Sequence, residues 1–499
     1  MNYATFSSGN TWGGLLHVCV ALAFYSSIAM ASDDSRPNFI VFLCDDLGWG
    51  DLGCFGHPHI RTPNLDQLAN TGVRLTSCYS AAPVCSPSRV GLLTGRSPNR
   101  AGVFDWIPAA TEPSPRQKAA RSLVHLRRTE TTLPGVLQKA GYATAMAGKW
   151  HCNAIFNDPQ QPQPDAAGFD HWLATQNNAA PSHENPNNYV RNGQPVGQLE
   201  GFSCQIVADE AIAWLQSHQQ RHASQPFFLY LPFHEPHEPV ASPDRLVESY
   251  RDVAANEEQA QYFANVENMD HAIGRVLAAL EDQGQSENTV VFFSSDNGPE
   301  TLNRYRGARR SYGSPGPLRG MKLWTTEAGS RVAGILRWSG KIRPGTENDQ
   351  PVSSLDLLPT FASLAKAPIP AGLDLDGCNI SALWEDAPVV RSKPLFWVYF
   401  NAINEQRVAM RDGPWKLLAK IETVEGKPMA KMENITTSRL SAVQAAKLTD
   451  FSLYRLSEDI GEANDVSKSQ PQELERLAAR LRNLYAELVQ SMHVWPDQP

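Results

Sequence analysis

Carboxylate and amide side chains stand directly after two apolar segments of strand length. Asp45 and Asp46 follow NFIVFLC, and Asp296 and Asn297 follow TVVFFSS. In an open α/β sheet the carboxyl ends of the strands line the ligand crevice, so both pairs are expected to meet there. Either pair alone would also suit a turn or a helix cap. Together they offer three carboxylates and an amide oxygen, a ligand set that favours a hard divalent cation.

A second cluster with reactive potential is the segment 85–89, which reads CSPSR. Its cysteine, Cys85, can be an inert thiol in a loop. By chemistry alone Arg89 can also lower the thiol pKa and turn Cys85 into a nucleophile. The residues by themselves leave both interpretations open.

The segment 85–96, with Cys85-x-Pro-x-Arg89 followed by LTGR, resembles the signature of the formylglycine-dependent type I sulfatases of the alkaline phosphatase superfamily. Further motifs of that family occur in order along nearly the whole mature chain: PNFI at 37–40, DDLG at 45–48, TPNLD at 62–66, GYAT at 141–144, GKWH at 148–151, PHEP at 236–239, SDNG at 295–298, RGMK at 319–322, EAGSR at 327–331 and LYRL at 453–456. So many motifs in order are far more specific than any one of them.

The resemblance implies a sulfuric ester hydrolase with an unusual nucleophile. A separate modifying enzyme converts Cys85 to Cα-formylglycine, whose aldehyde is hydrated to a gem-diol. One diol hydroxyl attacks sulfur and expels the alcohol, and the sulfated hemiacetal then breaks down to restore the aldehyde. The chemistry has a physical reason, because a sulfate ester is an anion that repels ordinary nucleophiles and must be neutralised first.

The resemblance also implies a role for each motif residue. Asp45, Asp46, Asp296 and Asn297 hold one divalent cation together with the group derived from Cys85, and Asp296 also takes the proton of the attacking hydroxyl. Calcium is favoured over magnesium, because so many oxygen ligands suit a larger and more flexible shell. The remaining roles are as follows: Arg89 orients the diol, Lys149 and Lys322 neutralise sulfate oxygens, His151 is the base for hemiacetal breakdown, and His237 protonates the leaving alcohol with help from Lys322.

Two histidines compete for the role of acid in the segment HEPHEP at 234–239. The family pattern places a proline before the histidine and another two residues after it. His237 fits this pattern, and His234, which follows Phe233, does not. We therefore assign the acid to His237 and keep His234 as a substrate contact.

The substrate is expected to be a carbohydrate sulfate, of the galactose or N-acetylgalactosamine type. Loops 104–107, 183–189 and 305–312 are expected to shape the leaving-group pocket, because their aromatic and arginine side chains suit sugar faces and further sulfates. Two alternatives remain: a phosphodiesterase or phosphonate hydrolase of the same superfamily, and a catalytically silent sulfoglycan-binding protein in which Cys85 stays unmodified.

Apolar strands alternate with helical segments up to about residue 385, which predicts an alkaline-phosphatase-like α/β domain over 32–385 with a mostly parallel sheet covered by helices on both faces. The expected strands are 38–43, 142–147, 227–233, 289–294 and 335–338, and the expected helices are 64–72, 132–141 and 262–280. Short strands at 394–400, 406–410 and 415–421 and a helix at 472–492 predict a smaller C-terminal α+β domain with an antiparallel sheet over 386–499.

Composition and the N-terminus indicate where the protein works. The chain has 499 residues, is 42% hydrophobic and carries a formal net charge of −8. This charge gives no reason to expect nucleic acid as a partner. Residues 1–31 contain an apolar stretch that ends in Ala-Met-Ala, which predicts a cleaved signal peptide rather than a membrane anchor. The mature protein is thus expected to be exported, periplasmic or secreted, with no stable membrane span.

Overall fold

The computed structural model describes residues 36–109, 123–301 and 304–497, so the expected signal peptide lies outside the described residues. The main sheet has the strand order β10-β2-β9-β8-β1-β7-β3-β4-β5-β6, with β11 paired to β2. Its strands are β1 (Asn38–Asp45), β2 (Val73–Tyr79), β3 (Ala143–Lys149), β4 (His171–Thr175), β5 (Tyr189–Arg191), β6 (Gln194–Gly197), β7 (Phe227–Pro236), β8 (Thr289–Ser295), β9 (Arg331–Arg337), β10 (Thr346–Asn348) and β11 (Val352–Ser353).

Strand β1 lies at the centre of this sheet and is fully buried. It pairs in parallel with β7 on one side and with β8 on the other. Phe39, Val41 and Leu43 pack into one hydrophobic core. Ile40 and Phe42 pack into a second core on the opposite face. Alternate side chains of a strand point to opposite faces, so an uninterrupted apolar run is what a strand covered on both faces requires.

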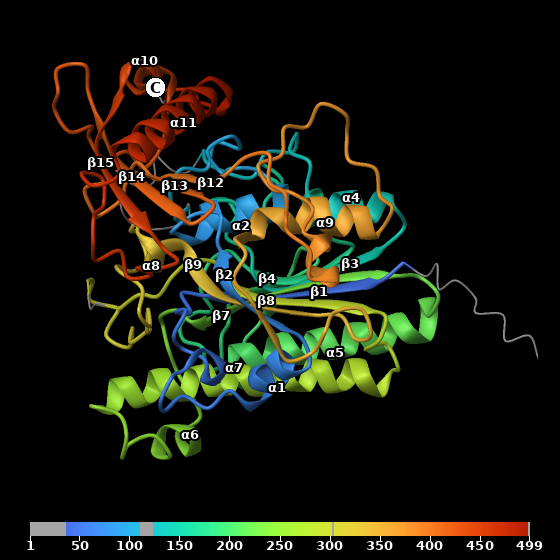
Figure 1. The fold of residues 1–499 in the computed structure, drawn as a ribbon. Coiled ribbons are helices and arrows are strands. Elements are labelled where there is room, and N and C mark those ends of the chain that lie inside the picture. Colours follow the sequence, from blue (N-terminus) through green and yellow to red (C-terminus); the bar gives the residue numbers. More distant parts are fainter. Residues whose placement is uncertain (1–35, 110–122, 302–303, 498–499) are drawn as a thin grey trace, which may run out of the picture. The chain divides into compact units, whose positions relative to one another are not determined.

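Helices cover both faces of the main sheet, as expected from the alternating pattern (Figure 1). One face carries α1 (Pro63–Asn70), α5 (Ser203–His222) and α7 (Glu257–Asp282), and the other carries α2 (Cys85–Thr94), α4 (Leu133–Lys139) and α9 (Leu357–Leu364). Shorter helices are α6 (Asp244–Glu248), α8 (Glu327–Ser330) and the 3-10 segments Gly53–Phe55, Pro164–Ala167, Ser354–Asp356 and Ser381–Glu385. Within the part of the chain that the structure describes, no helix combines the length and apolar composition needed to cross a membrane.

The mostly parallel sheet also contains antiparallel pairs. Strand β9, of which only the second half is expected from the sequence, runs antiparallel to β2 and β8. Strands β2, β4, β5 and β6 are not among the expected strands. Strand β2 alternates between buried and half-buried positions rather than forming a continuous apolar run, and β5 and β6 are short. Strand β4 is largely buried, but its sequence HWLAT is short and contains polar residues. None of the four strands therefore shows the long apolar run by which a buried strand is recognised in the sequence.

The C-terminal region contains the expected antiparallel sheet, in the order β12-β13-β14-β15. Its strands are β12 (Leu395–Val398), β13 (Val408–Asp412), β14 (Trp415–Glu422) and β15 (Lys447–Arg455), and its helices are α10 (Thr437–Ala445) and α11 (Pro471–Ser491). The helix expected over 472–492 is confirmed as α11. The boundary between residues 385 and 386 stays a prediction.

Candidate active site

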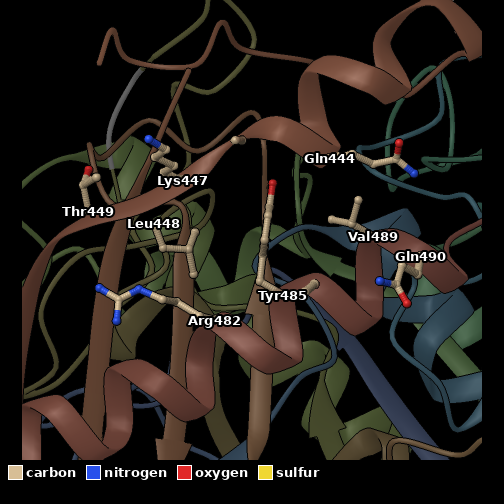
Figure 2. Close-up of a pocket in the computed structure, with 10 residues that line it drawn as sticks. Gln444, Lys447, Leu448, Thr449, Arg482, Tyr485, Val489 and Gln490 are labelled. Carbon is tan, nitrogen blue, oxygen red and sulfur yellow. The ribbon is translucent and has the colours of Figure 1, made fainter. Parts of the chain in front are cut away.

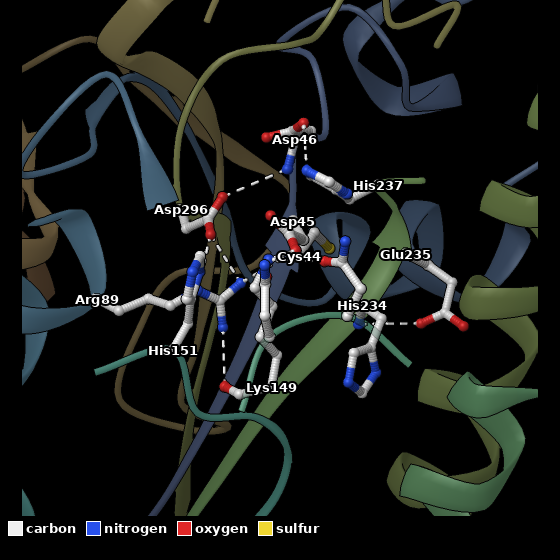
Figure 3. Close-up of polar contacts among 12 residues, drawn as sticks. Cys44, Asp45, Asp46, Arg89, Lys149, His151, His234, Glu235, His237 and Asp296 are labelled. Atoms are coloured by element: carbon white, nitrogen blue, oxygen red, sulfur yellow. Dashed lines mark hydrogen bonds and ion pairs between the residues drawn. The ribbon is translucent and has the colours of Figure 1, made fainter. Parts of the chain in front are cut away.

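Four neighbouring strands of the main sheet deliver chemically active side chains to one edge (Figure 3). Asp45 is the last residue of β1 and Lys149 the last of β3. Asp296 directly follows β8, and His237 directly follows β7. Because β1, β3, β7 and β8 are parallel neighbours, their carboxyl ends meet, and the expected convergence of the two acidic pairs is what the fold produces.

The acidic residues at this edge form a compact cluster of oxygen atoms. Asp45, Asp46 and His237 each offer a ligand atom, and these atoms lie within 4.8 Å of one another. Asn297 joins the cluster by donating from Nδ2 to Asp46 Oδ1 at 2.7 Å. Asp45 Oδ1 and Asn297 Oδ1 are buried acceptors with no hydrogen-bond donor among the described residues. Buried acceptors that lack donors are what a bound cation satisfies, so this donor set fits a hard divalent ion.

Three buried cations face the carboxylates. Lys149 Nζ donates to Asp45 Oδ2 at 2.5 Å, and Lys322 Nζ donates to Asp46 Oδ2 at 2.7 Å. Arg89 Nε donates to Asp296 Oδ2 at 2.8 Å. Burial disfavours a charged Asp45, but Lys149 in particular outweighs it and holds the Asp45 pKa well below its usual range. The cluster therefore combines fixed positive and negative charge in a site largely removed from water.

Burial, followed by the charge of Asp45, raises the pKa of Asp296 to about 7. Asp296 thus has the more basic of these two carboxylates, although Arg89 contacts it on the opposite side. A carboxylate with a pKa near neutrality can accept a proton under working conditions. The proton-accepting role that the sequence resemblance implies for Asp296 stays a prediction.

Cys85 is the first residue of α2 and is buried at the floor of the cavity described below. Burial raises the pKa of its thiol to about 11, although Lys149 and Lys322 act in the opposite direction. The Arg89 guanidinium is engaged by Asp296. Burial works against the interpretation of Cys85 as a thiolate nucleophile, because it favours the protonated form of an unmodified thiol.

The hydrogen bonds of the two active-site histidines fix which ring nitrogen carries the proton. His151 Nε2 bonds the carbonyl oxygen of Ile107 at 2.9 Å, and His237 Nδ1 bonds that of Glu238 at 2.6 Å. A carbonyl only accepts, so these nitrogens donate and leave His151 Nδ1 and His237 Nε2 as the working atoms. Burial, then Lys149, holds the pKa of His151 well below its usual value, and burial, then Lys322, lowers the pKa of His237 to about 4.

His234 and His237 occupy different environments. His237 lines the cavity and its Nε2 lies 3.6 Å from Asp46 Oδ2. His234 is fully buried, with Nε2 bonded to Thr175 Oγ1 at 2.8 Å and Nδ1 to the hydroxyl of Tyr189 at 3.3 Å. His234 does not belong to the cavity lining, so the structure brings His237 and not His234 to the place where a substrate can bind.

A cavity of about 370 Å³ opens above these residues. Its lining consists of Val84, Cys85, Trp106, His151, Asn177, Asn178, His237, Arg304, Tyr305, Lys322 and Leu323. Trp106 and Tyr305 come from two of the three loops expected to form the pocket. The third loop, 183–189, contributes nothing to the lining, and His183 is fully buried.

Asn177 and Asn178 take the place expected for the loop 183–189. They follow β4, a strand that the sequence pattern does not indicate, and Asn178 Oδ1 accepts from Lys149 Nζ at 3.1 Å. The reasoning that places Asp45 and Asp296 at strand ends applies equally to these amides once β4 is known. Their polarity in a turn is otherwise unremarkable.

A larger cavity of about 510 Å³ lies in the C-terminal region between α11 and the start of β15 (Figure 2). Its lining includes Lys447, Thr449, Arg482 and Tyr485, and no histidine, cysteine or carboxylate stands among the lining residues. The smaller cavity is therefore the candidate active site, because it contains the nucleophile candidate, two histidines and a lysine beside the acidic cluster.

Comparison with known proteins decides the family. The family model described as Sulfatase matches residues 37–367, which is more than half of the chain. The chain is a sulfatase. It belongs to the alkaline phosphatase superfamily and is a sulfuric ester hydrolase. The strands and helices that carry the acidic cluster, Lys149 and Cys85 all fall inside the matched segment.

Individual relatives span nearly all of this sulfatase. It is 33% identical to human arylsulfatase A over 514 aligned positions, covering 96% of this chain and 92% of the relative. It is 32% identical to the N-acetylgalactosamine-6-sulfatase of the dog, covering 80% and 79%. Among solved structures, Ps i-CgsB in complex with k-i-k-neocarrahexaose matches with a TM-score of 0.75 and 25% identity, covering 93% of this chain and 96% of that one.

Proposed function

We propose that this sulfatase hydrolyses sulfate monoesters of carbohydrates, of the galactose or N-acetylgalactosamine type, with a formylglycine made from Cys85. One observation carries the proposal: Cys85 lies in a single cavity with Lys322, His151 and His237, directly beside the acidic cluster. Relatives named N-acetylgalactosamine-6-sulfatase and a similar structure that holds a neocarrahexaose support a sugar substrate.

The fit of the oxygen cluster supports one divalent cation, for which we propose calcium. Asp45, Asp46, Asp296 and Asn297 would hold it, together with the modified residue 85. The orphaned acceptors Asp45 Oδ1 and Asn297 Oδ1 favour such an ion. When present, the cation and the hydrated formylglycine supply an activated oxygen nucleophile and neutralise charge on the sulfate.

Lys149 and Lys322 bind the sulfate oxygens in this proposal. Lys149 is fully buried and Lys322 nearly so, and each approaches the carboxylate cluster from a different element. Ammonium groups in a site with little water attract an anion far more strongly than they would at the surface. They therefore offset the repulsion between the substrate anion and the nucleophile.

The two histidines divide the proton transfers. His151 presents Nδ1 without a proton, so it accepts the proton from residue 85 that breakdown of the covalent adduct releases. His237 presents Nε2 toward the cavity, and we assign it the proton transfer to the leaving alcohol. Because Nδ1 already carries the proton that is donated to the Glu238 carbonyl, His237 donates from Nε2 in its imidazolium form, which a bound anionic substrate favours. A sugar alcohol is a poor leaving group, so this second transfer matters most for carbohydrate substrates.

We propose that the protein acts after export, in the periplasm or outside the cell. The apolar segment before residue 32 supports cleavage of a signal peptide. A separate modifying enzyme is a necessary partner, since residue 85 begins as an ordinary cysteine.

Turnover of a panel of defined sulfated sugars tests the proposed function. We expect sulfate release from monosulfated galactose or N-acetylgalactosamine and little or no release of 4-nitrophenol from bis(4-nitrophenyl) phosphate. A sulfate monoester offers three terminal oxygens to the two lysines and the two histidines, whereas a phosphodiester offers two and carries a second ester group in place of the third. Sulfate release is measured by ion chromatography. Hydrolysis of the phosphodiester alone, with every sulfated sugar left intact, would contradict the proposal.

Replacing His237 by alanine is expected to affect poor leaving groups selectively. We expect kcat to fall by about 10²–10⁴-fold on the sugar sulfate and by less than about tenfold on 4-nitrophenyl sulfate, because only the sugar alcohol needs a proton as it departs. Steady-state kinetics on both substrates provide the measurement and its internal control. Equal losses on the two substrates would instead place His237 among the cation ligands, as its closeness to Asp46 would permit.

A further inference from the structure

The lining of the cavity that contains Cys85 also carries an arginine with an internal partner. Arg304 lines the cavity, and its Nε lies 3.0 Å from both carboxylate oxygens of Glu300. Arg304 Nη2 contacts Glu300 Oε2 as well. The Glu300 side chain is 4% exposed, whereas that of Arg304 is 27% exposed. The carboxylate is therefore hidden behind the arginine, and the arginine is what a ligand meets.

This arrangement fixes Arg304 and cancels its charge. A guanidinium gripped along one edge by a buried carboxylate keeps a single orientation, because both groups lose hydrogen bonds if it turns away. A pair with no net charge attracts an anion weakly, and an anion bound to Arg304 would also be repelled by Glu300. Arg304 Nη1 has no partner among the described residues, so it keeps its donors for a ligand oxygen.

The lysine of the lining also has a carboxylate partner. Lys322 is paired with Asp46 and belongs to the part of the cavity where the scissile sulfate binds. Arg309 and Arg310, from the loop that was expected to bind further sulfates, both contact Glu258 and do not line the cavity. Among the described residues, the lining thus also presents Trp106, Tyr305 and two asparagine amides, and it holds no lysine or arginine that lacks a carboxylate partner.

We propose that Arg304, held by Glu300, donates to an uncharged oxygen of the leaving-group sugar, and that this pair selects sugars with one sulfate over sugars with a second sulfate beside the scissile ester. This inference rests on the proposed function. The cavity volume lies near the lower end of the range for small-molecule sites, about 300–1,000 Å³, which leaves room for roughly one sugar ring. Trp106 and Tyr305 supply the aromatic surface that such a ring packs against.

The pair disfavours a second sulfate and also favours a hydroxyl at the same place. A second sulfate next to Arg304 would lose water and gain no net positive partner, since Glu300 already offsets the guanidinium. A hydroxyl in the same place gains a directed hydrogen bond and carries no charge to desolvate. Glu300 is therefore a positioning residue, and Arg304 is the residue that contacts the substrate.

The test compares four proteins: the wild type, Glu300→Gln, Arg304→Gln and, as a matched control, Glu258→Gln, which releases Arg310 outside the cavity. The probes are the 4-sulfate, the 6-sulfate and the 4,6-disulfate of N-acetylgalactosamine and of galactose, with 4-nitrophenyl sulfate as a substrate that offers no sugar hydroxyl. For the wild type we expect kcat/KM on each disulfate to be at least about tenfold below that on the better monosulfate.

Glu300→Gln keeps an acceptor for Arg304 but removes the negative charge, so it is expected to raise the ratio of disulfate to monosulfate kcat/KM by about tenfold. Arg304→Gln is expected to raise KM for the monosulfated sugar by about tenfold more than KM for 4-nitrophenyl sulfate, which offers no sugar hydroxyl to Arg304. The Glu258→Gln protein should retain the wild-type ratio.

The outcomes distinguish a failure of this inference from a failure of the proposed function. Wild-type turnover of disulfates as fast as monosulfates overturns this inference alone, and so does an unchanged ratio in Glu300→Gln. If Glu300→Gln does not fold, the effect of Arg304→Gln on KM decides, and an unchanged KM overturns the inference. Turnover of no sulfated sugar by the wild type overturns the proposed function and this inference with it.

Discussion

Replacing Cys85 by alanine is expected to abolish sulfatase turnover, by on the order of 10⁴-fold or more, while the fold persists. Residue 85 would supply the nucleophile, and nothing else in the cavity lining offers a hydroxyl or thiol in its place except the phenol of Tyr305. Only the polar end of one small side chain is lost from a site packed against Val84, Tyr399 and Ala402, so stability should change by about 1 kcal/mol. Activity and thermal unfolding of purified protein measure both effects.

The matched control for this variant is Cys78→Ala, which removes an equally buried thiol on β2 that does not line the cavity. Its activity should equal that of the wild type. Mass analysis of the wild-type peptide that contains residue 85 completes the test, because an aldehyde or its hydrate is expected there. An intact thiol in fully active enzyme would contradict the formylglycine mechanism, and an active Cys85→Ala protein would exclude residue 85 as the nucleophile.

Replacing Lys416 by methionine is expected to destabilise the protein by about 3 kcal/mol. Lys416 lies on β14 and is fully buried, and its Nζ donates to Glu327 Oε1 at 2.7 Å. Burial disfavours a charged Glu327, but Lys416, followed by Arg331, outweighs it and lowers the Glu327 pKa to about 2. Methionine preserves much of the packing volume, so the loss isolates the charge that compensates Glu327.

Loss of the Lys416–Glu327 ion pair should also affect the active site, because Glu327 directly follows the loop that carries Lys322. The Glu327 amide donates to Glu462 Oε2 at 2.9 Å, and the Glu327 carboxylate also accepts from the Tyr79 hydroxyl at 2.7 Å. The C-terminal sheet therefore helps hold a loop of the catalytic region through buried polar contacts. Chemical denaturation at several pH values measures the effect.

The pH dependence follows from the direction of the Glu327 pKa shift. A carboxyl with a folded-state pKa of about 2 and an ordinary value of 4.5 contributes stability that is present above about pH 4.5 and is lost as pH falls through 2. The difference between wild type and Lys416→Met should thus be largest near neutral pH and shrink under acidic conditions.

Lys420→Ala is the control for this second variant, because it removes a lysine from the same strand whose ion pairs with Glu405 and Asp450 are exposed. Such pairs contribute about 0–1 kcal/mol. A loss below about 1 kcal/mol for Lys416→Met, no greater than for Lys420→Ala, would show that Glu327 does not depend on the lysine.

Much of the catalytic half of the fold is predictable because its central strands are buried on both faces. NFIVFL, FFLYLPF and TVVFFS are apolar runs that only a covered sheet explains, and β1, β7 and β8 are observed there. Strands β2, β4, β5 and β6 lack that signal, so the sequence pattern does not reveal them. The direction of β9 is also hidden, because an apolar strand reads the same whether its neighbours are parallel or antiparallel.

The candidate site likewise contains residues that the sequence predicts and residues that only the structure reveals. Motifs and strand ends are enough to locate Asp45, Lys149, His237 and Asp296, because local sequence determines which residue follows a strand. The amides of residues 177 and 178, and the exclusion of the loop 183–189, depend on a strand that the sequence pattern does not indicate. The protonation state of the residue 85 thiol is hidden as well, since its pKa depends on burial, which the neighbouring residues do not reveal.

The family, the order of the chemical groups and the residues that carry them can thus be read from the amino-acid chain, because motifs and strand ends are local features. The tertiary structure determines which groups are charged, which line the substrate cavity and which form ion pairs within the chain. Arg304 shows why: four residues away in sequence, Glu300 is an ordinary carboxylate, and only its burial behind the guanidinium makes the two side chains an ion pair without net charge. Electrostatic character depends on distance and solvent exclusion, and these are properties of the folded chain.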